Sequence, residues 1–259
     1  MSRRPALLSG DADAPFPPAN TALRQPDGLL AIGGDLSPTR LLDAYRHGIF
    51  PWFSEGQPIL WWSPDPRMVF RTCNVHLGSR FQRSLRTSQW RIRADTAFDQ
   101  VVTACAQLPR RGQAGTWITD DMRAAYLQLH RLGHAHSVEV FDAEKLVGGI
   151  YGVAIGRMFF GESMFSAVTG GSKVALFALA QRLAGWGWPL IDAQVANDHL
   201  ISLGAFEMCR AEFLEEVRML TVLPEPAGPW DERFGDFRAS ELLATPQVNG
   251  FFASLAPSG

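Results

Sequence analysis

The order of strand-like and helix-like segments between residues 137 and 209 limits the fold most tightly. Three strand-like runs come first, separated by short turns: 137–141, 146–154 and 158–165. Four segments then alternate between helix and strand: an apolar helix over 172–184, a buried strand over 189–195, a short helix over 198–203 and a strand over 206–209. This order predicts an antiparallel meander within a mixed sheet that helices cover, an α+β fold.

The segments before residue 137 predict a smaller unit and further helices. Ser37 can cap a helix over 38–47, because Pro38 suits the first helical position and Gly48 suits the end. Helices are also expected over 97–108 and 120–132, whereas the first thirty residues predict an irregular arm along a domain surface. We expect three parts: a small N-terminal domain over 1–65, a catalytic domain over 66–223 and a partly irregular tail over 224–259.

Composition narrows the class of protein. A hydrophobic share of 46% with 19% charged residues excludes wholesale disorder. The chain has no run of eighteen apolar residues, and the apolar stretch near its start is too short for a secretory signal. We therefore expect a cytoplasmic protein that does not enter a membrane, and we expect a monomer.

A cluster of arginines suggests a polyanionic partner. Between residues 67 and 93 there are seven arginines and no Asp or Glu: Arg67, Arg71, Arg80, Arg83, Arg86, Arg91 and Arg93. A solvated basic face is the ordinary explanation for such a run. The missing acids favour a surface that binds phosphates, to which Arg110 and Arg111 would add.

Common catalytic motifs are missing from the sequence. It contains no G-x-S-x-G elbow, no Walker loop and no H-E-x-x-H motif, and His134 and His136 lack a third ligand nearby, so no metal is expected. An acetyltransferase-like fold would allow coenzyme A as donor. However, the R-x-x-G-x-G spacing at 182–187 ends a predicted helix, whereas a pyrophosphate loop should precede one. Coenzyme A is therefore disfavoured, and no cofactor is expected.

Three polar residues lie in strands that should be apolar. Strand alternation would place Glu162 on one face together with Phe160 and Met164, where a carboxylate costs free energy unless it is paired. Asp192 and Gln194 share a face of the next predicted strand. These residues are either hydrogen-bonded core groups or the catalytic centre of an acyl transferase, with Glu162 reserved for a cationic ligand.

Around these residues the sequence resembles the bacterial leucyl/phenylalanyl-tRNA-protein transferases, which move Leu or Phe from aminoacyl-tRNA to proteins that begin with Arg or Lys. The resemblance covers roughly residues 14 to 220 and depends on several ordered blocks. Among them are Gly28 to Pro38, Gly48 to Phe53, Leu60 to Arg67, Gly115 to Thr119, Leu132 to Ser137, Val147 to Gly152, Gly161 to Ser166, Ile191 to Val195 and Asn197 to His199.

The resemblance implies an acetyltransferase-like (GNAT-like) catalytic domain and a role for particular residues. Trp52 and Trp117 would hold the terminal adenosine of the tRNA, and Glu162, Asp192 and Gln194 would lie close to the reacting ester. The amino-acid pocket would be lined by Ile150, Met164, Leu176, Leu179 and Leu183, and the tRNA backbone would be bound by Arg67, Arg80, Arg83 and Arg86. Products would be marked for degradation that depends on the N-terminal residue.

The resemblance leaves several questions open. Family members often carry methionine at the position of Ile150 and phenylalanine at Leu179 and Leu183, so the preference among Leu, Phe and Met is not determined. It also does not show which of the three polar residues handles the proton. A coenzyme A-dependent N-acetyltransferase and a non-catalytic tRNA-binding protein remain the alternatives.

Overall fold

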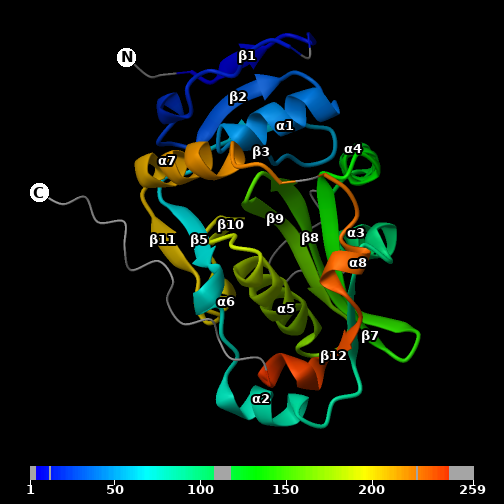
Figure 1. Cartoon of the computed structure of the whole chain (residues 1–259). Helices are drawn as coiled ribbons and strands as arrows, with labels where there is room; N and C mark the ends of the chain where they lie inside the picture. The colour runs from blue at the N-terminus through cyan, green and yellow to red at the C-terminus, as the bar shows by residue number, and fades with distance from the viewer. Residues whose placement is uncertain (1–3, 12, 108–117, 226, 245–259) are drawn as a thin grey trace, which may run out of the picture.

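The computed structural model describes residues 4–11, 13–107, 118–225 and 227–244, which form two sheets (Figure 1). The smaller sheet lies at the top of the figure and has the strand order β1-β2-β4-β3. Its strands are β1 (Ala6–Leu8), β2 (Leu29–Gly33), β3 (Phe50–Pro51) and β4 (Leu60–Trp62), and helix α1 (Pro38–Arg46) packs beside them. We call these elements the N-terminal unit.

The larger sheet has eight strands in the order β11-β5-β10-β9-β8-β7-β6-β12. Its strands are β5 (Arg67–Arg71), β6 (Arg91–Ala94), β7 (Ala135–Asp142), β8 (Lys145–Ile155), β9 (Met158–Ser166), β10 (Leu190–Gln194), β11 (Phe206–Met208) and β12 (Phe237–Arg238). Strand β10 pairs with β9 in parallel, and every other neighbouring pair is antiparallel, so the sheet is mixed.

Helices cover both faces of this sheet. They are α2 (Ser79–Leu85), α3 (Phe98–Gln107), α4 (Asp120–Arg131), α5 (Gly171–Gly185), α6 (Asp198–Ile201), α7 (Arg210–Thr221) and α8 (Asp231–Phe234), with 3₁₀ turns η1 (Ala19–Thr21), η2 (Thr72–Asn74) and η3 (Ala239–Leu243). The predicted α+β class, with a small N-terminal unit and a helix-covered mixed sheet, is confirmed. Within the described residues, none of the helices has the length and apolar content needed to cross a membrane.

Two hydrophobic clusters lie on opposite faces of the large sheet. The first joins the N-terminal unit to the sheet, since Tyr45 of α1, Tyr126 of α4 and Phe160 of β9 belong to one cluster. The second surrounds α5, whose side chains are buried along most of its length. This helix is apolar all round because the sheet and other elements enclose it.

Local sequence signals explain α1 well. The Ser37 side chain accepts a hydrogen bond from the Arg40 amide at 3.3 Å, Pro38 occupies the first turn, and Gly48 after the helix has φ +69°. A left-handed residue at that place ends the helix, and glycine adopts it without a Cβ clash. The predicted helix over 38–47 is confirmed.

The chain ends contain more regular structure than the sequence predicted. The expected irregular arm includes β1, which pairs in parallel with β2, and buried Arg40 donates to the carbonyl oxygens of Asp11 and Ala14. At the other end of the chain, the segment after residue 224 adds β12 to the edge of the large sheet. Its Trp230 stacks on His136 with ring centroids 4.0 Å apart. Elements this short carry no periodicity that a sequence window could detect.

Candidate active site

Glu162 lies in a β-bulge near the middle of β9. Tyr151 of β8 pairs with Ser163 and Gly152 pairs with Gly161, so Glu162 is the extra residue between two paired positions. A bulge reverses the alternation of side chains that follow it. Glu162 therefore faces the N-terminal unit, whereas Met164 packs into the cluster around α5. The predicted common face of Glu162 and Met164 is wrong because simple alternation ignores the bulge.

Three side chains hold the Glu162 carboxylate. Tyr126 donates a hydrogen bond to Oε2 at 2.5 Å, and Tyr45 donates to Oε1 at 2.8 Å. The Gln194 side-chain amide also donates to Oε1 at 2.8 Å. The two tyrosine hydroxyls are themselves 2.8 Å apart. The carboxylate thus gains three donors: Tyr45 from the N-terminal unit, Tyr126 from α4 and Gln194 from β10 of the large sheet.

Burial raises the pKa of Glu162 to about 7, although the hydrogen bonds from Tyr126 and Tyr45 act to lower it. The negative charge of Asp192 adds to the increase, and Arg67 opposes it. Burial also raises the pKa of Tyr45 and of Tyr126 well above its ordinary value, with the Glu162 charge as the next cause. Both tyrosines therefore stay protonated donors, while Glu162 can exchange a proton near neutral pH.

Asp192 is held in a different way. Arg67 Nε and Nη2 donate to its two carboxylate oxygens at 2.8 and 2.7 Å, and both side chains have 0% exposure. The third guanidinium nitrogen, Nη1, donates to the Gly48 carbonyl at 3.1 Å. The Arg67 guanidinium also lies over the rings of Phe50 and Phe213, at 4.6 and 4.5 Å. This is a fully buried, two-point ion pair.

A second bulge positions Gln194. The register between β10 and β5 shifts between Asp192 and Gln194, and Gln194 has φ +62°, a left-handed conformation that is uncommon for residues other than glycine. Asp192 Oδ1 accepts the Gln194 backbone N–H at 2.9 Å and so stabilises this turn. The chain of contacts therefore runs from Arg67 through Asp192 and the Gln194 backbone to Glu162.

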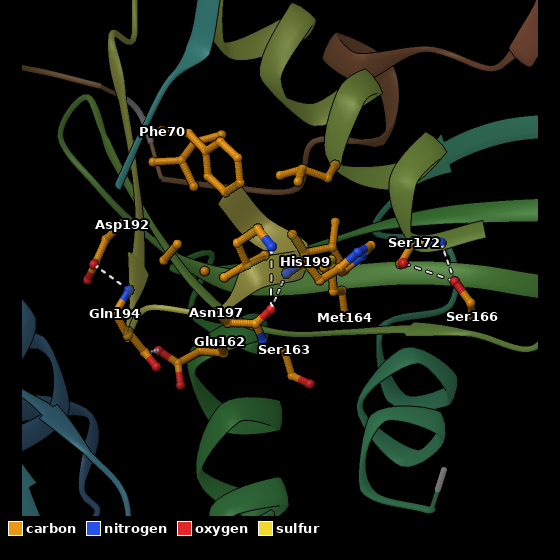
Figure 2. A pocket seen from close by; sticks show the side chains of 16 residues that line it. Phe70, Glu162, Ser163, Met164, Ser166, Ser172, Asp192, Gln194, Asn197 and His199 are labelled. Carbon is orange, nitrogen blue, oxygen red and sulfur yellow. Dashed lines mark hydrogen bonds between the residues drawn. The ribbon is translucent and has the colours of Figure 1, made fainter. Parts of the chain in front are cut away.

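These groups border a cavity of about 450 Å³ (Figure 2). Its polar lining at one end is Glu162, Asp192 and Gln194, and at the other end Ser166 and Ser172, with His199 and Met164 between them in the figure. Apolar side chains complete the walls: Phe70, Ile150, Met164, Leu176, Ile191 and Leu200. A few polar groups in a mostly apolar concave wall are typical of a small-ligand site.

The structure divides the predicted amino-acid pocket into two layers. Ile150, Met164 and Leu176 line the cavity. Leu179 and Leu183 have 0% exposure and lie in the core cluster around α5 instead of on the cavity wall. The leucines one and two turns further along α5 therefore support the wall from behind.

Of the two residues predicted to hold the adenosine, only Trp52 lies within the described residues. Trp52 is 37% exposed in the N-terminal unit, where its ring contacts Trp62 with centroids 5.9 Å apart. The Trp62 indole donates to the Trp52 carbonyl at 2.7 Å. Trp117 lies outside the described residues. An exposed, supported indole is suited to stacking on a base.

The arginines of the cluster differ in their surroundings. Arg71 pairs with Glu216, and Arg91 and Arg93 both pair with Asp236, so acids distant in sequence neutralise them. Arg67 is buried on Asp192, and in this position it cannot reach a phosphate. The remaining three predicted contacts are exposed on or just after α2: Arg80, Arg83 and Arg86.

The sequence alone does not single out Tyr45 and Tyr126 as partners of Glu162, or Arg67 as the buried partner of Asp192. Tyr45 and Tyr126 lie within the helices predicted over 38–47 and 120–132, and neither has a local sequence signal that points to Glu162. The contacts join residues 117 and 36 positions apart in the chain. One signal in the sequence could have helped: Tyr45 lies on the apolar face of α1, and a buried tyrosine hydroxyl needs a hydrogen-bond partner.

Comparison with known proteins places this site in a family. A family model described as leucyl/phenylalanyl-tRNA protein transferase matches residues 69–218, and the model of the N-terminal domain of such proteins matches residues 34–65. The chain is 68% identical over 243 residues to the leucyl/phenylalanyl-tRNA--protein transferase of Xanthomonas euvesicatoria pv. vesicatoria (strain 85-10), covering 94% of this chain and 97% of that protein.

Two further relatives carry the same name. Identity is 67% to the protein of Xanthomonas campestris pv. campestris (strain B100), with 93% of this chain and 98% of that protein covered. It is 61% to the protein of Xylella fastidiosa (strain M23), with 94% of this chain and 100% of that protein covered. The matched regions contain Glu162, Asp192 and Gln194 together with Tyr45 and Tyr126.

Proposed function

The chain belongs to the leucyl/phenylalanyl-tRNA protein transferase family, an aminoacyltransferase family, and on this premise we propose its substrates and the roles of its residues. It transfers Leu or Phe from aminoacyl-tRNA to the α-amine of proteins that begin with Arg or Lys, and the product is marked for degradation. The observation that carries the residue roles is Glu162, a buried carboxylate with a pKa of about 7 at the edge of an apolar cavity.

Glu162 acts as the proton acceptor in this proposal. The α-amine of the acceptor must be neutral to attack the ester carbonyl, and a base with a pKa near the working pH suits its deprotonation. A bond forms between the amine nitrogen and the carbonyl carbon, and the bond to the ribose oxygen breaks. The proton that the nitrogen loses after attack passes, through Glu162, to that oxygen as it leaves. Alignment of two bound reactants contributes an effective molarity of roughly 10⁵ M or more.

Gln194 and Asp192 have supporting roles. The Gln194 amide holds Glu162 and faces the cavity, so it can orient the amine or the ester carbonyl. Asp192 is a positioning residue, because Arg67 occupies its two oxygens and it holds the Gln194 backbone in its left-handed turn. Because Arg67 occupies both Asp192 oxygens, Glu162 is the carboxylate that we assign to the proton.

The donor would occupy the rest of the site. Its terminal adenosine stacks on Trp52, and its apolar side chain enters the part of the cavity bordered by Ile150, Met164 and Leu176. The stem of the tRNA follows the exposed arginines of α2, since basic side chains bind a duplex backbone without reading its sequence. Burial of a Leu or Phe side chain contributes roughly 1.5–3 kcal/mol, which selects apolar donors over polar ones.

Transfer to defined peptides tests the function. Leu-tRNA or Phe-tRNA is incubated with the enzyme and a peptide that begins with Arg or Lys, and the peptide mass is expected to increase by one Leu or Phe residue. The same peptide beginning with Ala serves as acceptor control, and acetyl coenzyme A replaces charged tRNA as donor control. Modification by acetyl coenzyme A without transfer from tRNA would identify an acetyltransferase instead.

Removal of the Tyr45 hydroxyl is expected to shift the pH dependence of transfer. The hydrogen bond from Tyr45 lowers the pKa of Glu162, so Tyr45→Phe raises that pKa further. Transfer requires ionised Glu162, so the rise of the transfer rate with pH should move to higher pH by about one unit. This shift corresponds to the loss of a hydrogen bond to a charged group, which contributes roughly 1.5 kcal/mol. The measurement is the single-turnover rate constant of transfer as a function of pH.

Tyr126→Phe provides the matched comparison for this experiment. It removes the other phenolic donor to Glu162 and should move the limb in the same direction. If both variants lower transfer equally at every pH, the tyrosines do not act through the Glu162 proton. The assignment of Glu162 as base would then be wrong.

A further inference from the structure

The chain uses lysine at only two positions, Lys145 and Lys173, whereas its other basic side chains are arginine or histidine. Lys145 is the exposed first residue of β8, next to the turn from β7. Lys173 lies in the first turn of α5, which contains no acidic residue. A cation at this end of a helix is unfavourable because the helix dipole is positive there. Such a local conflict is expected mainly where function requires it.

Lys173 lies close to the end of the cavity that is distant from Glu162. Ser172, its neighbour in the chain, lines the cavity together with Ser166 and His199 (Figure 2). Burial lowers the pKa of His199, and the charge of Lys173 lowers it further. His199 is consequently a neutral imidazole, in which one ring nitrogen is an N–H donor.

The same end of α5 adjoins the basic helix α2. A Cβ atom at Gly170, which precedes α5, would lie 2.4 Å from the ring of Phe81 in α2, so these elements are in direct contact. In the described part of the chain no acid forms an ion pair with Lys173 or with the three α2 arginines. Unneutralised positive charge therefore continues from α2 to the cavity.

The two ends of the donor site lie far apart in the molecule. Figure 1 shows α2 at the bottom and the N-terminal unit, which carries Trp52, at the top. If the stem lies on α2 and the adenosine on Trp52, the unpaired 3′ nucleotides must cross the region between them. His199 lines the cavity in that region, and Lys173 follows the cavity-lining Ser172 in the first turn of α5, which begins beside α2.

We propose that Lys173 and His199 bind a phosphodiester group in the single-stranded 3′ end of the donor tRNA. Lys173 supplies the charge and His199 supplies a hydrogen bond to a phosphate oxygen. This contact rests on the proposed function, because it assumes a tRNA donor, and it deepens that function by assigning a route to the 3′ end. The contact positions the ester over the cavity without reading base identity.

Donors of three lengths test the contact. They are Phe attached to adenosine alone, Phe attached to the trinucleotide CCA, and Phe-tRNA. Lys173→Gln should raise KM for the trinucleotide and the tRNA about fivefold more than KM for the adenosine donor, which lacks the phosphodiester groups. The slope of log affinity against log salt for tRNA should fall by about 0.7, the value for one phosphate on a single strand. His199→Gln should show the same order of donors with a smaller effect on the salt slope.

Two further variants separate this contact from others. Lys145→Gln removes the other lysine and should alter none of these ratios, whereas Arg83→Gln should weaken only the full tRNA. The proposal is overturned if Lys173→Gln affects all three donors equally, leaves all three unaffected, or changes KM only for the acceptor peptide. Wild-type enzyme that transfers from none of the donors would instead refute the proposed function.

Discussion

Asp192→Asn is expected to lower the free energy of unfolding by about 3–5 kcal/mol, because it leaves the Arg67 guanidinium buried without its counter-charge. Both side chains have 0% exposure, so water cannot replace the lost carboxylate. Asparagine matches the shape of aspartate, which means that the change tests charge and not volume. Urea unfolding followed by tryptophan fluorescence at pH 7 gives the measurement.

The control for this prediction is Asp236→Asn. Asp236 pairs with Arg91 and Arg93 at the surface, where exposures range from 32% to 41%, so the loss should be at most about 1 kcal/mol. A double variant, Arg67→Met with Asp192→Leu, removes both buried charges and should recover much of the stability. Transfer should remain impaired in it, since the Gln194 turn has lost its support. Equal destabilisation by Asp192→Asn and Asp236→Asn would contradict the importance assigned to the buried pair.

Glu162→Gln is expected to have opposite effects on activity and stability. Transfer should fall about 10²- to 10⁴-fold, the range for loss of a general base. The folded protein should become more stable above pH 7 by on the order of 3 kcal/mol, because glutamine avoids the cost of burying a charge. The relevant measurements are single-turnover transfer and urea unfolding between pH 4 and 8.5.

The pH range of this stability gain follows from the raised pKa. Below about pH 4.5 the carboxyl group is protonated in both folded and unfolded chains, so the variant gains nothing there. Between pH 4.5 and 7 the unfolded chain ionises first and wild-type stability decreases, and above pH 7 the difference is constant. Glu144→Gln, at an exposed turn, is the control and should alter neither quantity. Retained transfer in Glu162→Gln would remove Glu162 from the proton step.

The regular elements that repeat a period were predictable from the sequence. The meander of β7, β8 and β9 and the later series α5, β10, α6 and β11 were all expected near their observed bounds. Among them, β7, β8, β9 and α5 have enough residues for a period to show, whereas α6 and β11 have only four and three residues. The five-residue β5 was missed because it follows an aromatic and proline-rich stretch, and β12 has only two residues. These two segments are strands because they pair with neighbouring strands of the sheet, not because their own sequences show a strand pattern.

The polar residues of the site were predictable, but their connections were not. Glu162, Asp192 and Gln194 stood out because apolar strands should not contain them. Arg67 was grouped with surface arginines, since sequence shows charge density but not burial. Its partner is 125 positions away, and the two tyrosines reach Glu162 from separate helices. Tertiary structure alone brings such residues together.

The bulge at Glu162 separates two properties that an engineer would want to change independently. Because the strand changes face at this residue, the carboxylate belongs to one layer of the protein and Met164, two positions later, to the other. Under the proposed function, libraries at Ile150, Met164 and Leu176 are therefore expected to change the range of donor amino acids while the layer that holds the Glu162 carboxylate stays unchanged. Deletion of a single residue between Gly161 and Ser163 would remove this independence, and a screen for new donors should vary side chains here but never strand length.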